Sequence, residues 1–522
     1  MATYASRPAW ALRTRAITSA KVVIPLGLGA LVLVSLLLRR TELNIGFWID
    51  EGLSVGIADR PLGDIPEALK KDGSPPLYYM LLHFWLNLAG SSEVGVRSLS
   101  VLFALLAIPV AFWAGRAVWG TNKAGWFSAV LMAFNPFLAQ YAQEARMYAM
   151  VACLAIPVTT CFIKAYALDT VNRRPWIAGF AVSEAVSLYT HNWPIFFGIA
   201  AGLAFLFLLA VSDRRKALFR DGLLGFGGFL VLYLPWVPTT LYQAAHTGAP
   251  WSDAPTFGSL LGVPATLLGR MPEIVLLICA GAGLLALVRT RPLNQYARAA
   301  ICLAIIAFGT PTLAWLMSQA SPAWANRYLA VGLPPLLLLA AGGLTYARRL
   351  GFVGLALVAI MWAQDHAPVE KSNVRAVAHN IAPSLKPGDL VISTQPETVP
   401  VLHYYLPDGL RYATLTGEET DLGVWDWRDG VDRLEKTSPQ KDLIPLIDSL
   451  KPGTRVVLVE PITWTVNRWR APWTSLIRIR SKEWSQALSN DPRLEVASIQ
   501  PTHFTPPRPN PVQATVMVKT RG

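Results

Sequence analysis

The sequence predicts an all-α polytopic membrane domain followed by a C-terminal α/β domain. Its composition is the first observation: of 522 residues, 53% are hydrophobic and 15% are charged, against about 25% charged in an ordinary soluble domain. The second is a series of apolar runs between Val22 and Trp362, many of which approach the roughly 20 residues needed to cross a bilayer. Third, residues 365–522 become polar, which is typical of a separate soluble domain.

Positive charge between the apolar runs determines the predicted topology. Clusters of Lys and Arg alternate with the other span ends and mark cytoplasmic loops; they lie at residues 115–123, 172–174, 213–220, 289–298 and 348–349. Counting on this basis gives about eleven spans. They are residues 22–38, 97–114, 124–140, 148–168, 175–190, 194–211, 222–239, 274–288, 299–318, 328–346 and 351–364. We expect residues 1–21 in the cytoplasm and, because the number of spans is odd, residues 365–522 outside the cell membrane.

The first apolar run is expected to be a retained span, because no small-residue cleavage site precedes Arg39-Arg40. The first outer loop then covers residues 41–96 of the transmembrane domain, 22–364. Within this loop, Leu77–Leu88 is apolar but short, and it contains a histidine and an asparagine. We therefore expect it to lie in the membrane interface or to re-enter it partly. A full crossing here would place every later basic cluster outside.

A local repeat organises the C-terminal region. Ser384–Ile392 and Ser449–Leu458 each combine a helix end, a Pro-Gly turn and a β-rich run. Strands that alternate with helices predict an α/β domain with a partly parallel sheet. No Gly-rich phosphate-binding loop opens this domain, so we expect no nucleotide site there.

Two features of the composition exclude other classes. The formal net charge of +13 does not indicate nucleic-acid binding, because the basic residues fall in short clusters beside apolar runs. The cysteines lie inside apolar runs and lack metal-ligand spacing, so we interpret them as small buried hydrophobes. They are Cys153, Cys161, Cys279 and Cys302.

Polar motifs gather at the span ends that are predicted to lie outside. Asp50-Glu51 stands in the first outer loop, Asp72-Gly73-Ser74-Pro75-Pro76-Leu77-Tyr78 follows, and Gln143-Glu144-Ala145-Arg146-Met147-Tyr148 comes after the third span. Ionisable groups at membrane depth are costly and mark functional sites. Because these groups converge on one face, they predict a site at the outer membrane surface.

Together with Gly95-Val96-Arg97, Tyr189-Thr190-His191 and Asn326-Arg327-Tyr328-Leu329, these motifs resemble the glycosyltransferase family 39 group of the GT-C superfamily. Protein O-mannosyltransferases and the aminoarabinose transferases of lipid A belong among its relatives. The resemblance covers residues 20–360. It implies a plasma-membrane enzyme that moves a sugar from a polyprenyl monophosphate carrier to an acceptor hydroxyl on the outer face.

The residues fit that chemistry independently. An acceptor oxygen that attacks an anomeric carbon needs a base, and Asp50 is of the right type in the right compartment. The departing phosphate needs cationic stabilisation, for which Arg146 is the natural bidentate donor and Arg327 the second choice. Because a single displacement inverts the anomeric centre, we expect an inverting transferase.

Structural interpretations stand beside these roles. Glu51 is equally suited to position the acceptor or to cap a helix. Asp72 is a turn residue in its structural interpretation and a site residue in its functional one. Arg146 is an interface anchor in its structural interpretation and a phosphate ligand in its functional one. His191 also fits a structural hydrogen bond. The candidate catalytic residues are Asp50 and Glu51, and the candidate substrate-binding residues are Asp72, Tyr78, Glu144, Arg146, Tyr148, His191 and Arg327.

Cofactor and partners follow from the resemblance. Asp50-Glu51 with Asp72 could hold a divalent cation, as in some GT-C relatives, but the family 39 resemblance favours metal-independent transfer. The expected partners are the lipid carrier and an acceptor that is a glycan, a glycolipid or a protein. Ser74-Pro75 stands where some aminoarabinose transferases carry a lysine, which leaves the sugar open.

Two other classes remain as alternatives. A transporter or flippase of lipid-linked glycans is favoured by the helix-breaking Gly309-Thr310-Pro311. A cell-envelope scaffold, in which the C-terminal domain binds a partner, is the third.

Overall fold

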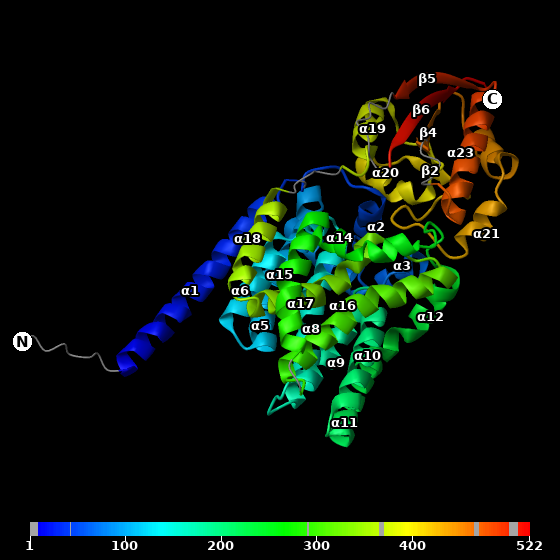
Figure 1. The fold of residues 1–522 in the computed structure, drawn as a ribbon. Coiled ribbons are helices and arrows are strands. Elements are labelled where there is room, and N and C mark those ends of the chain that lie inside the picture. Colours follow the sequence, from blue (N-terminus) through cyan, green and yellow to red (C-terminus); the bar gives the residue numbers. More distant parts are fainter. Residues whose placement is uncertain are drawn as a thin grey trace, which may run out of the picture.

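A computed structural model describes residues 9–41, 43–289, 292–364, 370–463, 469–500 and 510–521. A bundle of helices carries a smaller sheet domain at one end (Figure 1). The bundle helices are α1 (Ala9–Leu38), α2 (Ile49–Ala58), α3 (Ile65–Asp72), α4 (Leu77–Ala89), α5 (Glu93–Trp119), α6 (Asn122–Phe134), α7 (Pro136–Ala142), α8 (Tyr148–Phe162), η1 (Ile163–Ala167), α9 (Arg174–Leu188), α10 (Pro194–Val211), α11 (Arg215–Tyr233), η2 (Leu234–Trp236), α12 (Val237–His246), α13 (Phe257–Leu261), α14 (Val263–Leu268), α15 (Arg270–Val288), α16 (Gln295–Ala320), η3 (Asn326–Gly332), α17 (Leu333–Tyr346) and α18 (Arg349–Gln364).

The bundle has the length and composition of a multi-pass membrane domain. In the described part of the chain, eight helical stretches are long and apolar enough to cross a membrane. They are Lys21–Leu38, Glu93–Trp119, Tyr148–Ala167, Pro194–Val211, Arg215–His246, Arg270–Val288, Gln295–Ala320 and Asn326–Tyr346. The other predicted spans correspond to shorter helices: α6 with 13 residues, α9 with 15 and α18 with 16.

The predicted span 124–140 is broken in two. Helix α6 ends at Phe134 and α7 begins at Pro136, because proline has no N–H to donate and disfavours a helical residue before it. The Asn135 side chain instead accepts a hydrogen bond from the Leu138 N–H at 2.9 Å and caps α7. Residues 124–140 therefore form two helices and not one continuous helix.

Helix α4 occupies the segment that was expected to stay at the interface. Its 13 residues extend about 20 Å, which is short of the roughly 30 Å of a hydrocarbon core. The predicted boundary between residues 21 and 22 falls inside α1, which is continuous. The predicted boundary at residues 365–368 lies outside the described residues.

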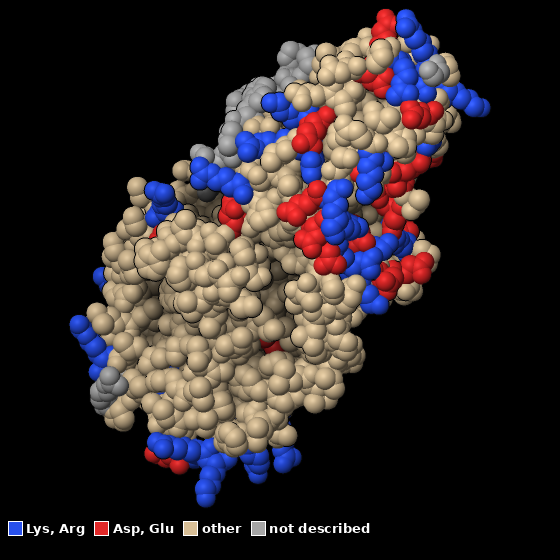
Figure 2. Space-filling model, turned by 90° about the vertical axis from the view of Figure 1, so that its right-hand side faces the viewer, with Lys and Arg blue, Asp and Glu red and all other residues tan. Residues whose placement is uncertain are grey.

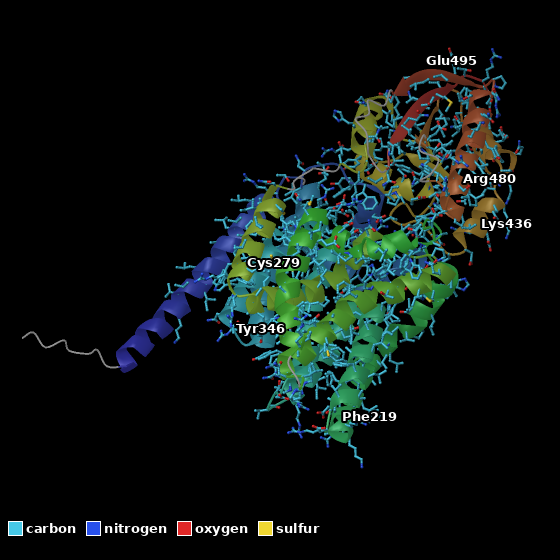
Figure 3. The ribbon with its side chains drawn as sticks, viewed as in Figure 1. Phe219, Cys279, Tyr346, Lys436, Arg480 and Glu495 are labelled. Carbon is cyan, nitrogen blue, oxygen red and sulfur yellow. The ribbon has the colours of Figure 1, made fainter. Side chains whose placement is uncertain are left out.

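Charge is distributed in bands along the molecule. On the face shown in Figure 2, Lys and Arg gather at the end of the bundle remote from the sheet domain, and mixed charges cover the sheet domain. The region between them is nearly free of charge. Figure 3 locates these ends by residue: Phe219 lies at the remote end of the bundle, and Lys436, Arg480 and Glu495 lie on the sheet domain.

The C-terminal domain is built on a six-stranded mixed sheet in the order β3-β2-β1-β4-β6-β5. Its strands are β1 (Leu390–Ser393), β2 (Arg411–Thr414), β3 (Gly417–Glu418), β4 (Arg455–Pro461), β5 (Leu494–Gln500) and β6 (Val512–Lys519). Its helices are α19 (Val374–Ile381), η4 (Ala382–Ser384), η5 (Pro396–Thr398), α20 (Val399–Tyr405), α21 (Gly430–Glu435), η6 (Pro439–Leu443), α22 (Ile444–Ser449) and α23 (Pro472–Ser489). Helix α19 packs on β6 and β5, and α23 packs on β4. The predicted α/β class with a partly parallel sheet is confirmed.

The sequence repeat becomes the centre of this sheet. Strand β1 runs parallel to both β2 and β4, with Leu390 paired to Arg411 and to Val456. The glycine of each Pro-Gly turn, Gly388 and Gly453, has a φ of 90°, a left-handed conformation that favours glycine. Each copy of the repeat therefore supplies the turn that starts one of two neighbouring parallel strands.

Helix α2 docks directly onto the C-terminal domain. A Cβ atom on Gly56 would overlap the backbone of Gly423, and one on Gly52 would lie 2.6 Å from Val401. Beside this contact Asp421 pairs with Arg60 and, at 3.0 Å, with Lys71. The two domains also share one continuous cluster of buried apolar residues. The start of α2 is therefore held between the bundle and the sheet domain.

Replacing Gly56 by Ala should destabilise the protein by about 1–3 kcal/mol, the usual cost of overpacking. The reason is that the added methyl group meets backbone, which cannot rotate away as a side chain can. Thermal unfolding of the full chain in detergent measures the effect. Gly63→Ala is the control, because nothing lies within 4 Å of a Cβ at that position. Equal stability of the two variants would contradict the close docking of α2.

Candidate active site

A cavity of about 490 Å³ lies between the end of the bundle and the C-terminal domain. Of the predicted site residues, those that line it are Asp50, Asp72, Arg146, His191 and Arg327. The predicted residues that do not line it are Glu51, Tyr78, Glu144 and Tyr148. The C-terminal domain and the segment leading into it supply the opposite wall through Lys371, Gln395, Glu397, Trp427, Thr474 and Asn510.

Asp50 lies in the first turn of α2 and faces two arginines. Nη2 of Arg327 lies 3.5 Å from Oδ2 of Asp50, and Nη1 of Arg146 donates to the Asp50 carbonyl oxygen at 3.4 Å. Among the described residues no donor lies within hydrogen-bonding geometry of Asp50 Oδ2, although this oxygen is buried. A carboxylate oxygen in the cavity wall is thus available to accept a proton, next to two cationic groups.

Glu51, the neighbouring carboxylate, points away from the cavity and is fully engaged. Its side chain is 1% exposed, as is that of Arg97, whose Nε and Nη2 donate to the two carboxylate oxygens at 2.8 and 2.6 Å. Oε1 also accepts from the Ala145 N–H at 2.8 Å, and Oε2 from the Trp48 N–H at 3.4 Å. Of the two interpretations that the sequence left open for Glu51, the geometry shows the helix-capping one.

Arg146 is buried beside a tyrosine and a carboxylate. Its Nη1 donates to the Tyr79 hydroxyl at 3.0 Å and to Ser54 Oγ at 3.3 Å, and Tyr79 in turn donates to Asp72 Oδ2 at 3.4 Å. Burial raises the pKa of Asp72, while the charge of Arg146 opposes the shift. Nε of Arg146 has no partner among the described residues, so the guanidinium retains hydrogen-bonding capacity for an anion.

Arg327 lies among aromatic rings at the start of η3. Its guanidinium carbon is 4.9 Å from the ring centre of Trp251, 5.3 Å from that of Tyr328 and 5.7 Å from that of Trp48. These cation–π contacts hold the side chain without a fully paired carboxylate. Its Nε likewise lacks a partner among the residues described.

Lys371 was not anticipated from the sequence. It reaches across from the segment before α19, where its Nζ lies 4.3 Å from the Trp48 ring centre and pairs with Glu144. Burial raises the pKa of Glu144, and the Lys371 charge counteracts the shift. Glu144, which was predicted to bind substrate, pairs with Lys371 and does not line the cavity. No local pattern around Lys371 marks it, because its partner is 227 positions away.

His191 is held as a neutral residue. The Trp193 N–H donates to its Nδ1 at 3.0 Å, so the neutral ring carries its proton on Nε2. Its ring centre lies 4.8 Å from that of Tyr328 and 6.0 Å from that of Tyr148. Burial lowers the pKa of His191 to about 3, with two neighbouring arginines adding to the shift. The ring therefore makes the structural hydrogen bond that was one of its two interpretations, and because it also lines the cavity, a contact with substrate stays a prediction.

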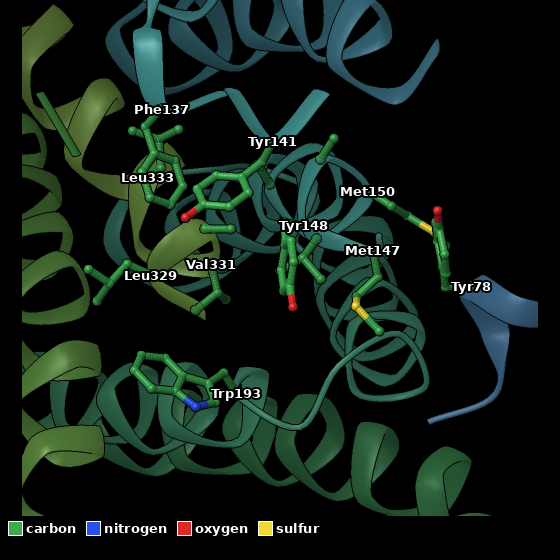
Figure 4. Packing of buried hydrophobic residues seen from close by; sticks show 14 of the residues in the cluster. Tyr78, Phe137, Tyr141, Met147, Tyr148, Met150, Trp193, Leu329, Val331 and Leu333 are labelled. Carbon is green, nitrogen blue, oxygen red and sulfur yellow. The ribbon is translucent and has the colours of Figure 1, made fainter. Parts of the chain in front are cut away.

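Tyr78 and Tyr148 pack in the core behind the cavity. Both side chains are fully buried. Figure 4 shows Tyr148 among Tyr141 and Met147, with Tyr78 to one side near Met150. Tyr79, one position along α4, is the tyrosine that reaches Arg146. Adjacent helical residues point about 100° apart, and only the packing of α4 shows which of the two tyrosines faces Arg146.

The arrangement suits an anion better than a metal ion. Arg146 and Arg327 line the bundle side of the cavity and Lys371 lines the opposite wall, and such a group of cationic side chains is the pattern of a phosphate-binding site. Among the residues that the structure describes, no three His, Cys, Asp or Glu side chains are grouped so that they could hold a metal ion. Metal-independent transfer stays a prediction.

No protein-family model and no curated protein matches the chain, but solved structures share its fold. ArnT from Cupriavidus metallidurans in the apo state superposes with a TM-score of 0.62 at 14% identity, covering 96% of this chain and 98% of that one. The same protein bound to undecaprenyl phosphate superposes with a TM-score of 0.58 at 15% sequence identity, and the match covers 95% of this chain and 98% of that one. A third structure is the archaeal oligosaccharyltransferase AglB from Archaeoglobus fulgidus in complex with an inhibitory peptide and a dolichol-phosphate. It superposes with a TM-score of 0.55 at 11% sequence identity, and the match covers 90% of this chain and 72% of that one. The chain therefore has the GT-C fold that its motifs predicted.

Glu51→Gln should destabilise the protein by about 3–5 kcal/mol, because it leaves the Arg97 guanidinium buried without a counter-charge. Asp50→Asn is the matched control: it alters a partly exposed carboxylate with one longer ion-pair contact, and should cost about 1 kcal/mol or less. Denaturation of both variants in the same detergent gives the comparison. A Glu51→Gln protein as stable as the control would show that the ion pair does not anchor α2.

The contribution of His191 to stability should depend on pH. In the unfolded chain its pKa is about 6.5, and in the folded chain about 3, so below pH 6.5 the unfolded state binds the proton and stability falls as pH falls. Between pH 7 and pH 5 the free energy of unfolding of the wild type should fall by about 2 kcal/mol, whereas that of a His191→Gln variant should not show this fall. The stability difference between the two proteins should therefore shrink over this range. A difference that is constant with pH would mean that His191 titrates normally.

Proposed function

We propose that this protein is a glycosyltransferase that moves a sugar from a polyprenyl-phosphate carrier to an acceptor hydroxyl group. One observation supports the proposal above all: Oδ2 of Asp50 is buried, lacks a hydrogen-bond partner among the described residues, lies 3.5 Å from Nη2 of Arg327, and shares a cavity with Arg146 and Arg327. A base and a cationic phosphate site are the two groups that this transfer requires from the protein.

Each residue has a defined part in the reaction. Asp50 takes the proton of the acceptor hydroxyl as its oxygen forms the new bond to the anomeric carbon. The bond from that carbon to the carrier phosphate breaks, and Arg146 and Arg327 stabilise the charge that the phosphate gains. Phosphate is a good leaving group, so no strong general acid is needed, and the single displacement inverts the anomeric centre.

The fold supports a lipid carrier. Two of the solved structures with this fold contain a lipid phosphate, undecaprenyl phosphate in ArnT and dolichol-phosphate in AglB. The chain also has several apolar helices of membrane-spanning length. A long polyprenyl tail in the bilayer and a phosphate in the cavity suit this arrangement.

The membrane orientation belongs to the same proposal. Basic residues gather at the end of the bundle remote from the C-terminal domain (Figure 2), and cytoplasmic ends of membrane proteins are enriched in Lys and Arg. We accordingly assign the cavity and residues 365–522 to the extracytoplasmic side of the plasma (inner) membrane. A family 39, mannosyltransferase-like donor specificity is part of the proposal, with a glycan, glycolipid or protein of the cell envelope as acceptor.

A transporter or flippase of lipid-linked glycans remains the alternative. Its site would be expected near the middle of the membrane, whereas the cavity described here lies where the bundle meets the C-terminal domain. Transfer in detergent separates the two functions, because only an enzyme forms product without two compartments.

The test uses the purified full chain, undecaprenyl phosphate as the binding probe, and sugar-labelled undecaprenyl phosphates in a transfer assay. Asp50→Asn should bind the carrier normally, while transfer falls on the order of 10²–10⁴-fold, the usual contribution of a general base. Arg146→Ala should weaken carrier binding, and Arg146→Lys should restore only part of it because the bidentate fork is lost.

Asp59→Asn is the control, since Asp59 is an exposed carboxylate at the other end of α2. Near-normal transfer by Asp50→Asn would refute the base assignment. Unchanged carrier binding by Arg146→Ala would return that residue to an interface anchor.

A further inference from the structure

The C-terminal domain presents a carboxylate to the cavity that the proposed reaction does not use. Glu397 lies in η5, directly after β1, and lines the cavity although its residue is only 6% exposed. The sequence offered no reason to single it out, because it lies in the soluble region, far along the chain from the polar motifs at the span ends. Its position between the two domains comes entirely from the docking of the sheet domain onto α2.

Two donors hold this carboxylate in one orientation. The Gln395 side-chain amide donates to Oε1 of Glu397 at 3.0 Å, and the Trp473 indole N–H donates to the same oxygen at 3.1 Å. The other oxygen, Oε2, is buried and has no partner among the described residues. One oxygen is therefore fixed by the protein, and the second is left to accept from something else.

Leaving a buried carboxylate oxygen unpaired is costly. No Lys or Arg pairs with Glu397 in the described part of the chain, and burial together with the nearby Asp50 charge raises its pKa. A ligand that donates hydrogen bonds would remove this penalty. Hydroxyl groups suit the place, since Trp427 and Trp251 also line the cavity and aromatic faces pack against sugar rings.

The sheet topology independently favours a ligand at this point. After β1 the chain goes to β2 on one side, and it later returns as β4 on the other side of β1. The strand order thus reverses between β1 and β4, and open α/β sheets bind ligands outside the carboxyl ends of the strands at such a reversal. Gln395 lies in the segment that follows the carboxyl end of β1, and Glu397 lies in η5, which begins at the next residue.

We propose that Gln395 and Glu397 form a subsite on the C-terminal domain that binds sugar hydroxyl groups of the acceptor, across the cavity from the arginines. The assignment of the bound sugar to the acceptor rests on the proposed function, whereas the binding of hydroxyl groups follows from the residues that line the cavity. Glu397 is a binding residue here and takes no part in proton transfer. The C-terminal domain thereby selects the acceptor, while the bundle binds the carrier.

The first experiment needs no catalysis. The full chain in detergent, saturated with undecaprenyl phosphate so that the carrier site is filled, is tested by saturation-transfer NMR against a panel of methyl glycosides. At least one glycoside should bind to the wild type, and Glu397→Gln should weaken it about 10- to 100-fold, the loss expected for a hydrogen bond to a charged group. Glu397→Asp keeps a carboxylate but shortens the side chain by one methylene group. The carboxylate then lies farther from the ligand, so this variant should also bind more weakly.

Glu460→Gln is the matched control, because Glu460 is a carboxylate of the same domain that lines a different cavity and accepts from Gln513 at 3.3 Å. Thermal unfolding confirms that the variants fold. If no glycoside binds the wild type, or if Glu397→Gln binds as well as the Glu460→Gln control, the subsite does not exist.

The second experiment identifies the source of the hydroxyl groups. In the transfer assay, Glu397→Gln should raise the KM for the acceptor about 10- to 100-fold and leave both undecaprenyl-phosphate binding and hydrolysis of the donor by water unchanged. A variant that loses donor hydrolysis as strongly as transfer would assign the contact to the donor sugar and overturn the acceptor subsite. A wild type that binds glycosides but transfers nothing would refute the proposed function and leave the sugar-binding subsite standing.

Discussion

The buried ion pair between Glu51 and Arg97 is the interaction on which the cavity depends. It joins α2 to α5, and because Glu51 also accepts from the Ala145 N–H, it joins both to the segment before α8. The residues next to its anchor points are Asp50 and Arg146. A carboxylate that never reaches the cavity therefore determines where the proposed base and the proposed phosphate ligand stand. Buried pairs of this kind contribute geometry more surely than net stability.

The second constraint is the contact between domains. Gly56 and Gly423 let two backbones meet, and Lys371 crosses from one domain to the Trp48 ring of the other. Since the apolar core is continuous across this contact, the C-terminal domain is part of the wall of the cavity. A site assembled this way can divide its work, with the bundle serving a lipid phosphate and the sheet domain serving a second substrate.

Asp50, Arg146 and Arg327 were named together from the sequence, and they line one cavity in the structure. Charged groups at the ends of apolar helices have few permitted locations, so Asp50, Arg146 and Arg327 were expected at one membrane face before their contacts were known. Their convergence was predicted, but the division between Asp50 and Glu51 was not. Two adjacent residues at a helix start point in different directions, and only the packing of α5 against α2 shows which one faces inward.

The sequence alone determined the membrane class of the bundle, the polar motifs at its ends, and the α/β repeat that becomes strands β1 and β4. These are local properties, set by hydrophobic run length, charge placement and turn chemistry. Only the tertiary structure revealed Tyr79, Lys371 and Glu397, and it alone split the span at Pro136. Contacts between residues hundreds of positions apart leave no local pattern, because they depend on how two separately predictable domains dock.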